Sequence, residues 1–204
     1  NIMLEMGANT IRLAHYQHAQ AFYDLCDQKG MIVWVEIPYI TEHMANGREN
    51  TLSQMRELVT QCRNHPSIVC WGLPNEITAS GGVNDDLMEN HRLLNDLCHR
   101  LDPTRPTTMA HAFMLDHHHP LVRLTDIRSY NLYYGWYLGD LEDNDAWFDA
   151  YHAEHPNEVI GLSEYGADAN PAYQSPNPER GDWTESYQAV YHEHMLKMWQ
   201  ERPY

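Results

Sequence analysis

The chain has 204 residues, of which 43% are hydrophobic and 21% are charged, and its formal net charge is -16. This composition is ordinary for a globular protein with one core, and no apolar run reaches the roughly 20 residues that a membrane span requires. The negative charge repels phosphate backbones and anionic membranes, so we expect neither nucleic acid nor a membrane as a partner.

Short apolar runs alternate along the chain with longer amphipathic segments. The apolar runs predict β-strands at residues 9–15, 31–40, 67–76, 107–113, 125–134 and 158–167. The amphipathic segments predict helices at residues 18–30, 51–65, 84–102, 143–155 and 183–201. Gly30 and Pro66 suit the ends of the first two helices, and Asn84 suits the start of the third.

Alternating strands and helices indicate parallel strands joined by right-handed crossovers. A doubly wound sheet and a (β/α)8 TIM barrel both fit this α/β pattern. The chain has no glycine-rich phosphate loop after its first strand, and polar residues recur where strands end, which favours the barrel. These residues are His15, Glu36, Asn75, Glu76, His111, Asn131, Tyr133 and Glu164. With six strands predicted, we expect residues 1–204 to be a partial barrel domain without its first and last strands.

Two glutamates at strand ends are the candidate catalytic residues. Glu76 follows the apolar run that contains Trp71 and Leu73, and such surroundings favour the protonated form that a general acid needs. Glu164 ends another apolar run, and as a nucleophile it would need hydrogen-bond donors such as Tyr133 and Arg12. A helix-capping carboxylate at Glu76 and a buried ion pair at Glu164 are the structural alternatives.

Five segments carry a family resemblance. They are GANTIRLAHYQ (7–17), NHPSIVCWGLPNE (64–76), DPTRP (102–106), DIRSYNLYYGWY (126–137) and GLSEYGAD (161–168). In order and spacing they resemble the catalytic barrel of glycoside hydrolase family 2, which includes β-galactosidases, β-glucuronidases and β-mannosidases. The resemblance implies a (β/α)8 barrel and a retaining double-displacement mechanism.

The resemblance also implies roles for individual residues. Glu76 matches the acid/base and Glu164 the nucleophile of the family. The positions that match substrate contacts are His15, Asn75, Asn131 and Tyr133. Trp136 follows the end of the predicted strand 125–134. Aromatic rings at such strand ends can stack on the C–H faces of sugars, so we expect Trp136 to contact substrate as well.

No metal and no cofactor is expected. Galactosidases of the enterobacterial type hold magnesium with an E-x-H pair, but the matching positions here are Ile40 and Glu42, and His43 is out of register. The histidines at 117–119 are consecutive and predict a polar loop. A metal-dependent hydrolase stays an alternative, although the chain has no H-E-x-x-H motif.

The expected reaction is hydrolysis of terminal, non-reducing β-glycosidic bonds in a carbohydrate substrate. We expect a β-galactosidase, with β-glucuronidase as the alternative. Residues 1–204 alone are expected to be weakly active or inactive, because a barrel without two strands has open edges that can pair in a homo-oligomer. The four cysteines form no C-x-x-C pair and predict buried reduced thiols, with a cytoplasmic location as the accompanying expectation.

Overall fold

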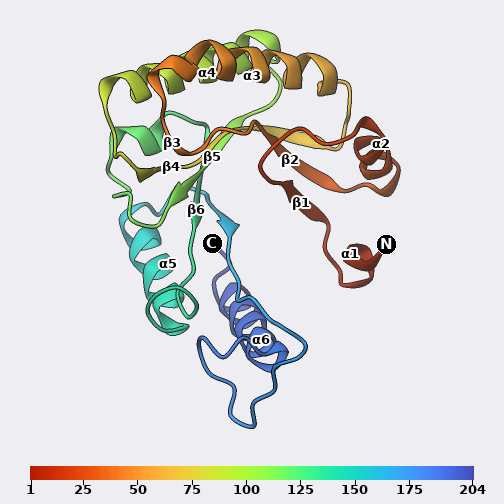
Figure 1. The fold of residues 1–204 in the computed structure, drawn as a ribbon, viewed down its shortest axis with the longest axis vertical. Coiled ribbons are helices and arrows are strands. Elements are labelled where there is room, and N and C mark those ends of the chain that lie inside the picture. Colours follow the sequence, from red (N-terminus) through yellow and green to blue (C-terminus); the bar gives the residue numbers. More distant parts are fainter. The chain divides into compact units, whose positions relative to one another are not determined.

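Parallel strands form the first of two units in the computed structural model, which describes all residues 1–204. The first unit is Asn1–Tyr130 and the second is Asn131–Tyr204. The first unit contains β1 (Thr10–Leu13), β2 (Ile32–Glu36), β4 (Ile68–Ser80), β5 (Thr107–Ala112) and all but the last residue of β6 (Ile127–Asn131). These strands are hydrogen-bonded in chain order, and a short strand β3 (Ile40–Glu42) pairs with β4 (Figure 1).

The helices of the first unit have recognisable ends. Besides the short α1 (Ile2–Glu5), they are α2 (Gln20–Lys29), α3 (Arg48–Cys62) and α4 (Asp85–Leu101). Gly30 ends α2 with a left-handed φ of 67°, as C-terminal glycines do. Asn84 caps α4, because its side chain accepts a 2.9 Å hydrogen bond from the Leu87 N–H. In Figure 1, α3 and α4 lie side by side along the β3–β5 part of the sheet.

Burial of apolar side chains holds this unit together. Its core joins strand residues such as Val33 and Trp71 to helix residues such as Met55 and Leu94, all of them fully buried. Each fully buried side chain of this size contributes about 1.5–3 kcal/mol relative to an exposed one. The strand ends at the carboxyl edge are thus fixed by a packed core, which is what a precise site requires.

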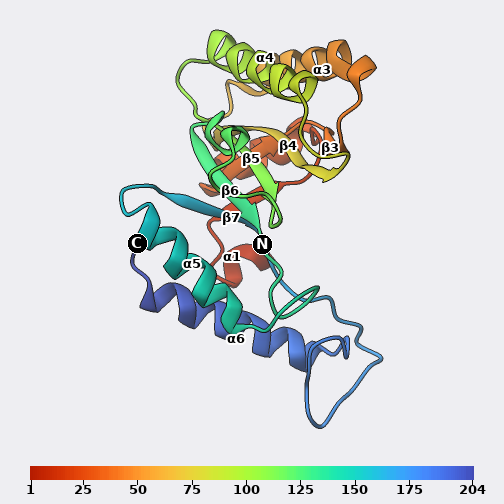
Figure 2. The same ribbon diagram turned by 90° about the vertical axis from the view of Figure 1, so that its left-hand side faces the viewer.

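The second unit contains β7 (Ile160–Glu164), α5 (Glu142–Glu154) and α6 (Glu185–Glu201). The Leu132 N–H donates to the Glu164 carbonyl (2.9 Å), so β7 lies beside the chain that leaves β6. Helices α5 and α6 lie side by side (Figure 2), and polar side-chain contacts join α5 to α6 and to the residue after it. His194 Nε2 lies 2.7 Å from Asp145, and Arg202 makes two hydrogen bonds to Asp149. Tyr191 and Met195 of α6 are fully buried.

Most of the predicted elements are confirmed. All six strands and five helices are present, and the four cysteines are buried and reduced. Strand β3 was not predicted, and β4 runs on to Ser80 because β3 extends its pairing. Trp183 and Trp199 are 46% and 37% exposed, whereas Tyr187 of α6 is buried. No helix is long and apolar enough to cross a membrane.

Candidate active site

A buried ion pair organises the carboxyl ends of β1 and β2. Arg12 Nε and Nη2 donate to the two carboxylate oxygens of Glu36, each at 2.9 Å. The Glu36 side chain is 1% exposed and that of Arg12 is 10% exposed. A bidentate ion pair of this kind fixes both side chains more firmly than a single hydrogen bond does. The guanidinium also lies 4.9 Å from the ring centre of Trp34, within the range of a cation–π contact.

The same carboxylate orients His15. His15 Nδ1 lies 2.7 Å from Glu36 Oε1. Because carboxylate oxygens paired with an arginine only accept hydrogen bonds, Nδ1 is the donor, and this sets the tautomer and the direction of the ring. The His15 side chain is 33% exposed, so it lies where a ligand can meet it. The structure thus joins the predicted residues Arg12 and His15 through Glu36.

Close packing of β2 against β4 depends on Gly72. A β-carbon at this position would lie 2.6 Å from Glu36 Cβ and 2.3 Å from Trp34 Nε1. Such approaches are too short for any side chain larger than hydrogen. Gly72 in the WGLPNE segment therefore lets the strand that carries Glu76 lie directly against Glu36.

Asn75 and Glu76 lie on β4 and are fixed from two sides. Asn75 is 6% exposed, and its Oδ1 accepts a 2.8 Å hydrogen bond from Arg12 Nη2. Its backbone N–H donates to the Tyr39 carbonyl at 3.0 Å. Glu76 is half-buried and has a φ of 46°. A non-glycine residue in this left-handed region costs about 1–3 kcal/mol and persists only where the surrounding structure holds it, which is common at active sites.

Glu164 ends β7 in the second unit and is held by a tyrosine. The Tyr133 hydroxyl donates a 2.7 Å hydrogen bond to Glu164 Oε2. The predicted nucleophile would need a hydrogen-bond donor of this kind. The structure thus shows a contact between Tyr133 and Glu164, and its role in orienting a nucleophile stays a prediction. The predicted contact of Arg12 with Glu164 stays a prediction.

Two further predicted residues lie close to this pair in the sequence. Asn131 is fully buried, and its Oδ1 accepts a 2.7 Å hydrogen bond from Ser163. Trp136 is 8% exposed and packs with its ring centre 5.1 Å from that of Trp183. Their assignment to substrate contact stays a prediction, because the contacts described here are structural ones.

Glu36 is the residue whose importance the sequence did not reveal. It was recognised as a polar strand end but not as the partner of Arg12, His15 and, through Arg12, Asn75. Its signal was a carboxylate at the end of an otherwise apolar strand, which burial makes costly unless a cation pairs with it.

Comparison with known proteins identifies the family of this chain. The profile described as "Glycosyl hydrolases family 2, TIM barrel domain" matches residues 1–202. The chain belongs to glycosyl hydrolase family 2. Its six parallel strands with intervening helices are accordingly part of a (β/α) barrel.

Similar proteins are named as β-glucuronidases. One from Bacteroides fragilis is 38% identical over the whole chain, which spans 30% of that protein. The crystal structure of an FMN-binding β-glucuronidase from Facaelibacterium prausnitzii is 46% identical, with a TM-score of 0.95 over 99% of this chain and 32% of that one. A Bacteroides uniformis β-glucuronidase 2, covalently bound to cyclophellitol-6-carboxylate aziridine, is 34% identical with a TM-score of 0.91, over 99% of this chain and 26% of that one. The chain thus spans about a third or less of these relatives.

Proposed function

We propose that the protein is a retaining β-glucuronidase that releases glucuronic acid from the non-reducing end of β-glucuronides. Membership of the family supports glycosidic hydrolysis, and the names of similar proteins favour glucuronides over the β-galactosides that the sequence first suggested. The observation that carries the proposal is the hydrogen bond from Tyr133 to Glu164 at the end of β7. It gives a family member the donor that an anionic nucleophile needs.

The proposed reaction has two steps. In the first, a Glu164 oxygen attacks the anomeric carbon, the bond from that carbon to the aglycone oxygen breaks, and Glu76 gives its proton to the leaving oxygen. In the second, Glu76 takes a proton from water, the water oxygen attacks the same carbon, and the ester to Glu164 breaks. Two inversions give net retention of configuration. The mechanism requires the two carboxyl groups to stand about 5–5.5 Å apart with substrate bound.

Residues near each glutamate are proposed to hold the sugar. His15, oriented by Glu36, is proposed to bind a hydroxyl group. Asn75 uses Oδ1 for Arg12, so its amide N–H groups are the atoms proposed to donate to substrate. Asn131 and Trp136 are proposed to line the site, the tryptophan by stacking on the sugar.

The test uses the intact protein that carries these residues, with paired para-nitrophenyl β-glucuronide and β-galactoside. We expect kcat/KM for the glucuronide to exceed that for the galactoside, and the β-anomer to form first in proton NMR. Glu164→Gln is expected to lower kcat by at least about ten-thousandfold.

Glu158→Gln is the matched control, because Glu158 also accepts a tyrosine hydroxyl, that of Tyr151 at 3.1 Å, but lies before β7 rather than at its end. This variant is expected to keep its activity. Full turnover in Glu164→Gln would overturn the nucleophile assignment. A preference for the galactoside would restore the first expectation and reject the glucuronide.

A further inference from the structure

Strand β3 supports the strained backbone of Glu76 from the neighbouring position on β4. Ile40 pairs with Asn75 and Glu42 pairs with Ser80, with an irregular register between them. Thr41, the residue between the two pairs, is itself in the left-handed region with a φ of 66°. For a β-branched residue this is a marked outlier. Thr41 on β3 and Glu76 on β4 are thus both strained. Both lie where the register between the two paired strands is irregular.

Burial of its own side chains does not hold β3 in place. The strand has only three residues, and all three are exposed. Such a strand contributes backbone hydrogen bonds but little apolar contact, and short exposed elements of this kind open readily. Something outside β3 must therefore fix it.

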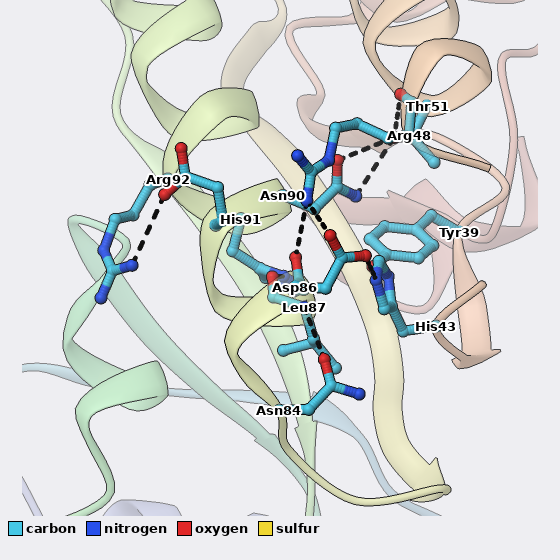
Figure 3. Close-up of polar contacts among 11 residues, drawn as sticks. Tyr39, His43, Arg48, Thr51, Asn84, Asp86, Leu87, Asn90, His91 and Arg92 are labelled. Carbon is cyan, nitrogen blue, oxygen red and sulfur yellow. Dashed lines mark hydrogen bonds and ion pairs between the residues drawn. The ribbon is translucent and has the colours of Figure 1, made fainter. Parts of the chain in front are cut away.

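A chain of polar contacts connects the residues on either side of β3 to each other and to α4 (Figure 3). The Tyr39 hydroxyl lies 2.5 Å from His43 Nδ1, and His43 Nε2 lies 2.6 Å from Asp86 Oδ2. Arg48 donates to the other carboxylate oxygen of Asp86. Tyr39 directly precedes β3 and His43 directly follows it, so this contact chain closes the segment that contains Thr41.

The proton positions in this chain are determined by its two ends. The hydrogen bond from His43, reinforced by Arg48, lowers the pKa of Asp86, so its carboxylate accepts. His43 Nε2 is then the donor to Asp86, and Nδ1 of the same ring lies against the Tyr39 hydroxyl. Burial raises the pKa of Tyr39 to about 12, which keeps that hydroxyl protonated.

The chain ends on two helices that are themselves joined. Arg48 is the first residue of α3, and Asp86 lies in the first turn of α4 behind the Asn84 cap. Thr51 of α3 and Asn90 of α4 are hydrogen-bonded at 3.2 Å. The His43 side chain is 4% exposed, so water does not compete strongly for its bonds.

We propose that Tyr39, His43, Asp86 and Arg48 form a clamp that positions the acid/base Glu76. The clamp fixes β3, the Tyr39 carbonyl holds the Asn75 N–H, and Asn75 holds the next residue in its left-handed conformation. These are positioning residues, since none is assigned a contact with substrate. The inference rests on the proposed role of Glu76.

The test compares two aryl glucuronides in the intact protein. A phenyl leaving group needs protonation by Glu76, whereas a dinitrophenyl group leaves without it. Asp86→Ala is expected to lower kcat/KM for the phenyl glucuronide about a hundredfold, and Tyr39→Phe about tenfold. For the dinitrophenyl glucuronide, both variants are expected to change kcat/KM by less than about threefold. Asp86→Asn keeps an acceptor oxygen for His43 and should recover most of the loss.

Two further variants calibrate the result. Arg92→Ala removes an exposed α4 side chain that pairs with Glu89 at 3.6 Å and does not reach β3, so it should leave both substrates unaffected. Glu76→Ala should show the same substrate pattern as Asp86→Ala in stronger form, with added azide raising kcat for the dinitrophenyl substrate. Equal losses on both substrates in Asp86→Ala, or none on either, would overturn the clamp.

Hydrogen exchange separates the clamp from the proposed function. The Asn75 amide should exchange at least about tenfold faster in Asp86→Ala than in Arg92→Ala, because its bond to the Tyr39 carbonyl opens more often. This measurement needs no substrate. A wild-type protein that cleaves no glucuronide would reject the proposed function, whereas unchanged exchange at Asn75 would reject the clamp.

Discussion

The two glutamates that we propose for catalysis are held in different ways. Around Glu76, the contacts act on the backbone and on Asn75, through Arg12 and the Tyr39 carbonyl. Glu164 instead receives a hydrogen bond on its own carboxylate from Tyr133. The difference fits the two roles, because an acid/base must gain and lose a proton while a nucleophile has to remain an anion. Fixing the backbone constrains position without favouring either protonation state.

The largest expected effect comes from breaking the ion pair beside Glu76. Glu36→Gln leaves the Arg12 charge buried without its partner, and such a loss costs about 3–5 kcal/mol in the free energy of unfolding. Asp149→Asn is the matched control, because Asp149 also receives two hydrogen bonds from an arginine, Arg202, but its side chain is 56% exposed. It should cost less than about 1 kcal/mol. Urea unfolding measures both, and equal costs would contradict the organising role of Glu36.

A smaller effect is expected at the nucleophile. Tyr133→Phe removes one hydroxyl donor from Glu164, and we expect kcat to fall about 10- to 100-fold with the fold intact. Tyr137→Phe serves as the control, since its ring centre lies 4.9 Å from that of Tyr133 and the side chain is 69% exposed. Wild-type kcat in Tyr133→Phe would show that the hydrogen bond does not support catalysis.

The effect that is smallest for each pH unit separates a buried histidine from an exposed one. Burial lowers the pKa of His111 to about 3, whereas in the unfolded chain it is about 6.5. Between these values the unfolded state binds the proton and the folded state does not. The stability is therefore complete above about pH 6.5 and falls by about 1 kcal/mol per pH unit below it. His111→Gln should remove its own share of this slope and leave that of His91, whose pKa burial lowers to about 4. His118→Gln, at an exposed position, should leave the slope unchanged. Equal slopes in wild type and His111→Gln would contradict the assignment.

The sequence predicts the framework of the fold well, because the framework depends on local patterns. Asn84 caps a helix as its residue type suggests, and Gly30 ends one. Strand β3 escaped prediction because three exposed residues carry no periodic pattern, and only the neighbouring β4 makes them a strand.

The site could be predicted only where chemistry coincides with a strand end. The strand ends suggest that Tyr133 lies near Glu164, and the structure places its hydroxyl 2.7 Å from Glu164 Oε2. The role of Glu36 could not be predicted, because its partner Arg12 lies 24 residues away and no local pattern indicates the pairing. The same applies to His43 and Asp86, which are 43 residues apart. Long-range polar contacts of this kind arise from the packing of elements, which single-sequence patterns do not encode.

The most direct test of the account is covalent labelling of the intact protein with a glucuronic-acid-configured cyclophellitol aziridine, followed by peptide mapping. In a retaining mechanism, this reagent forms an ester with the nucleophile and stops there. We expect a single label on Glu164, with none in Glu164→Gln. A label on Glu76 or on another carboxylate, in an enzyme that the reagent inactivates, would contradict it.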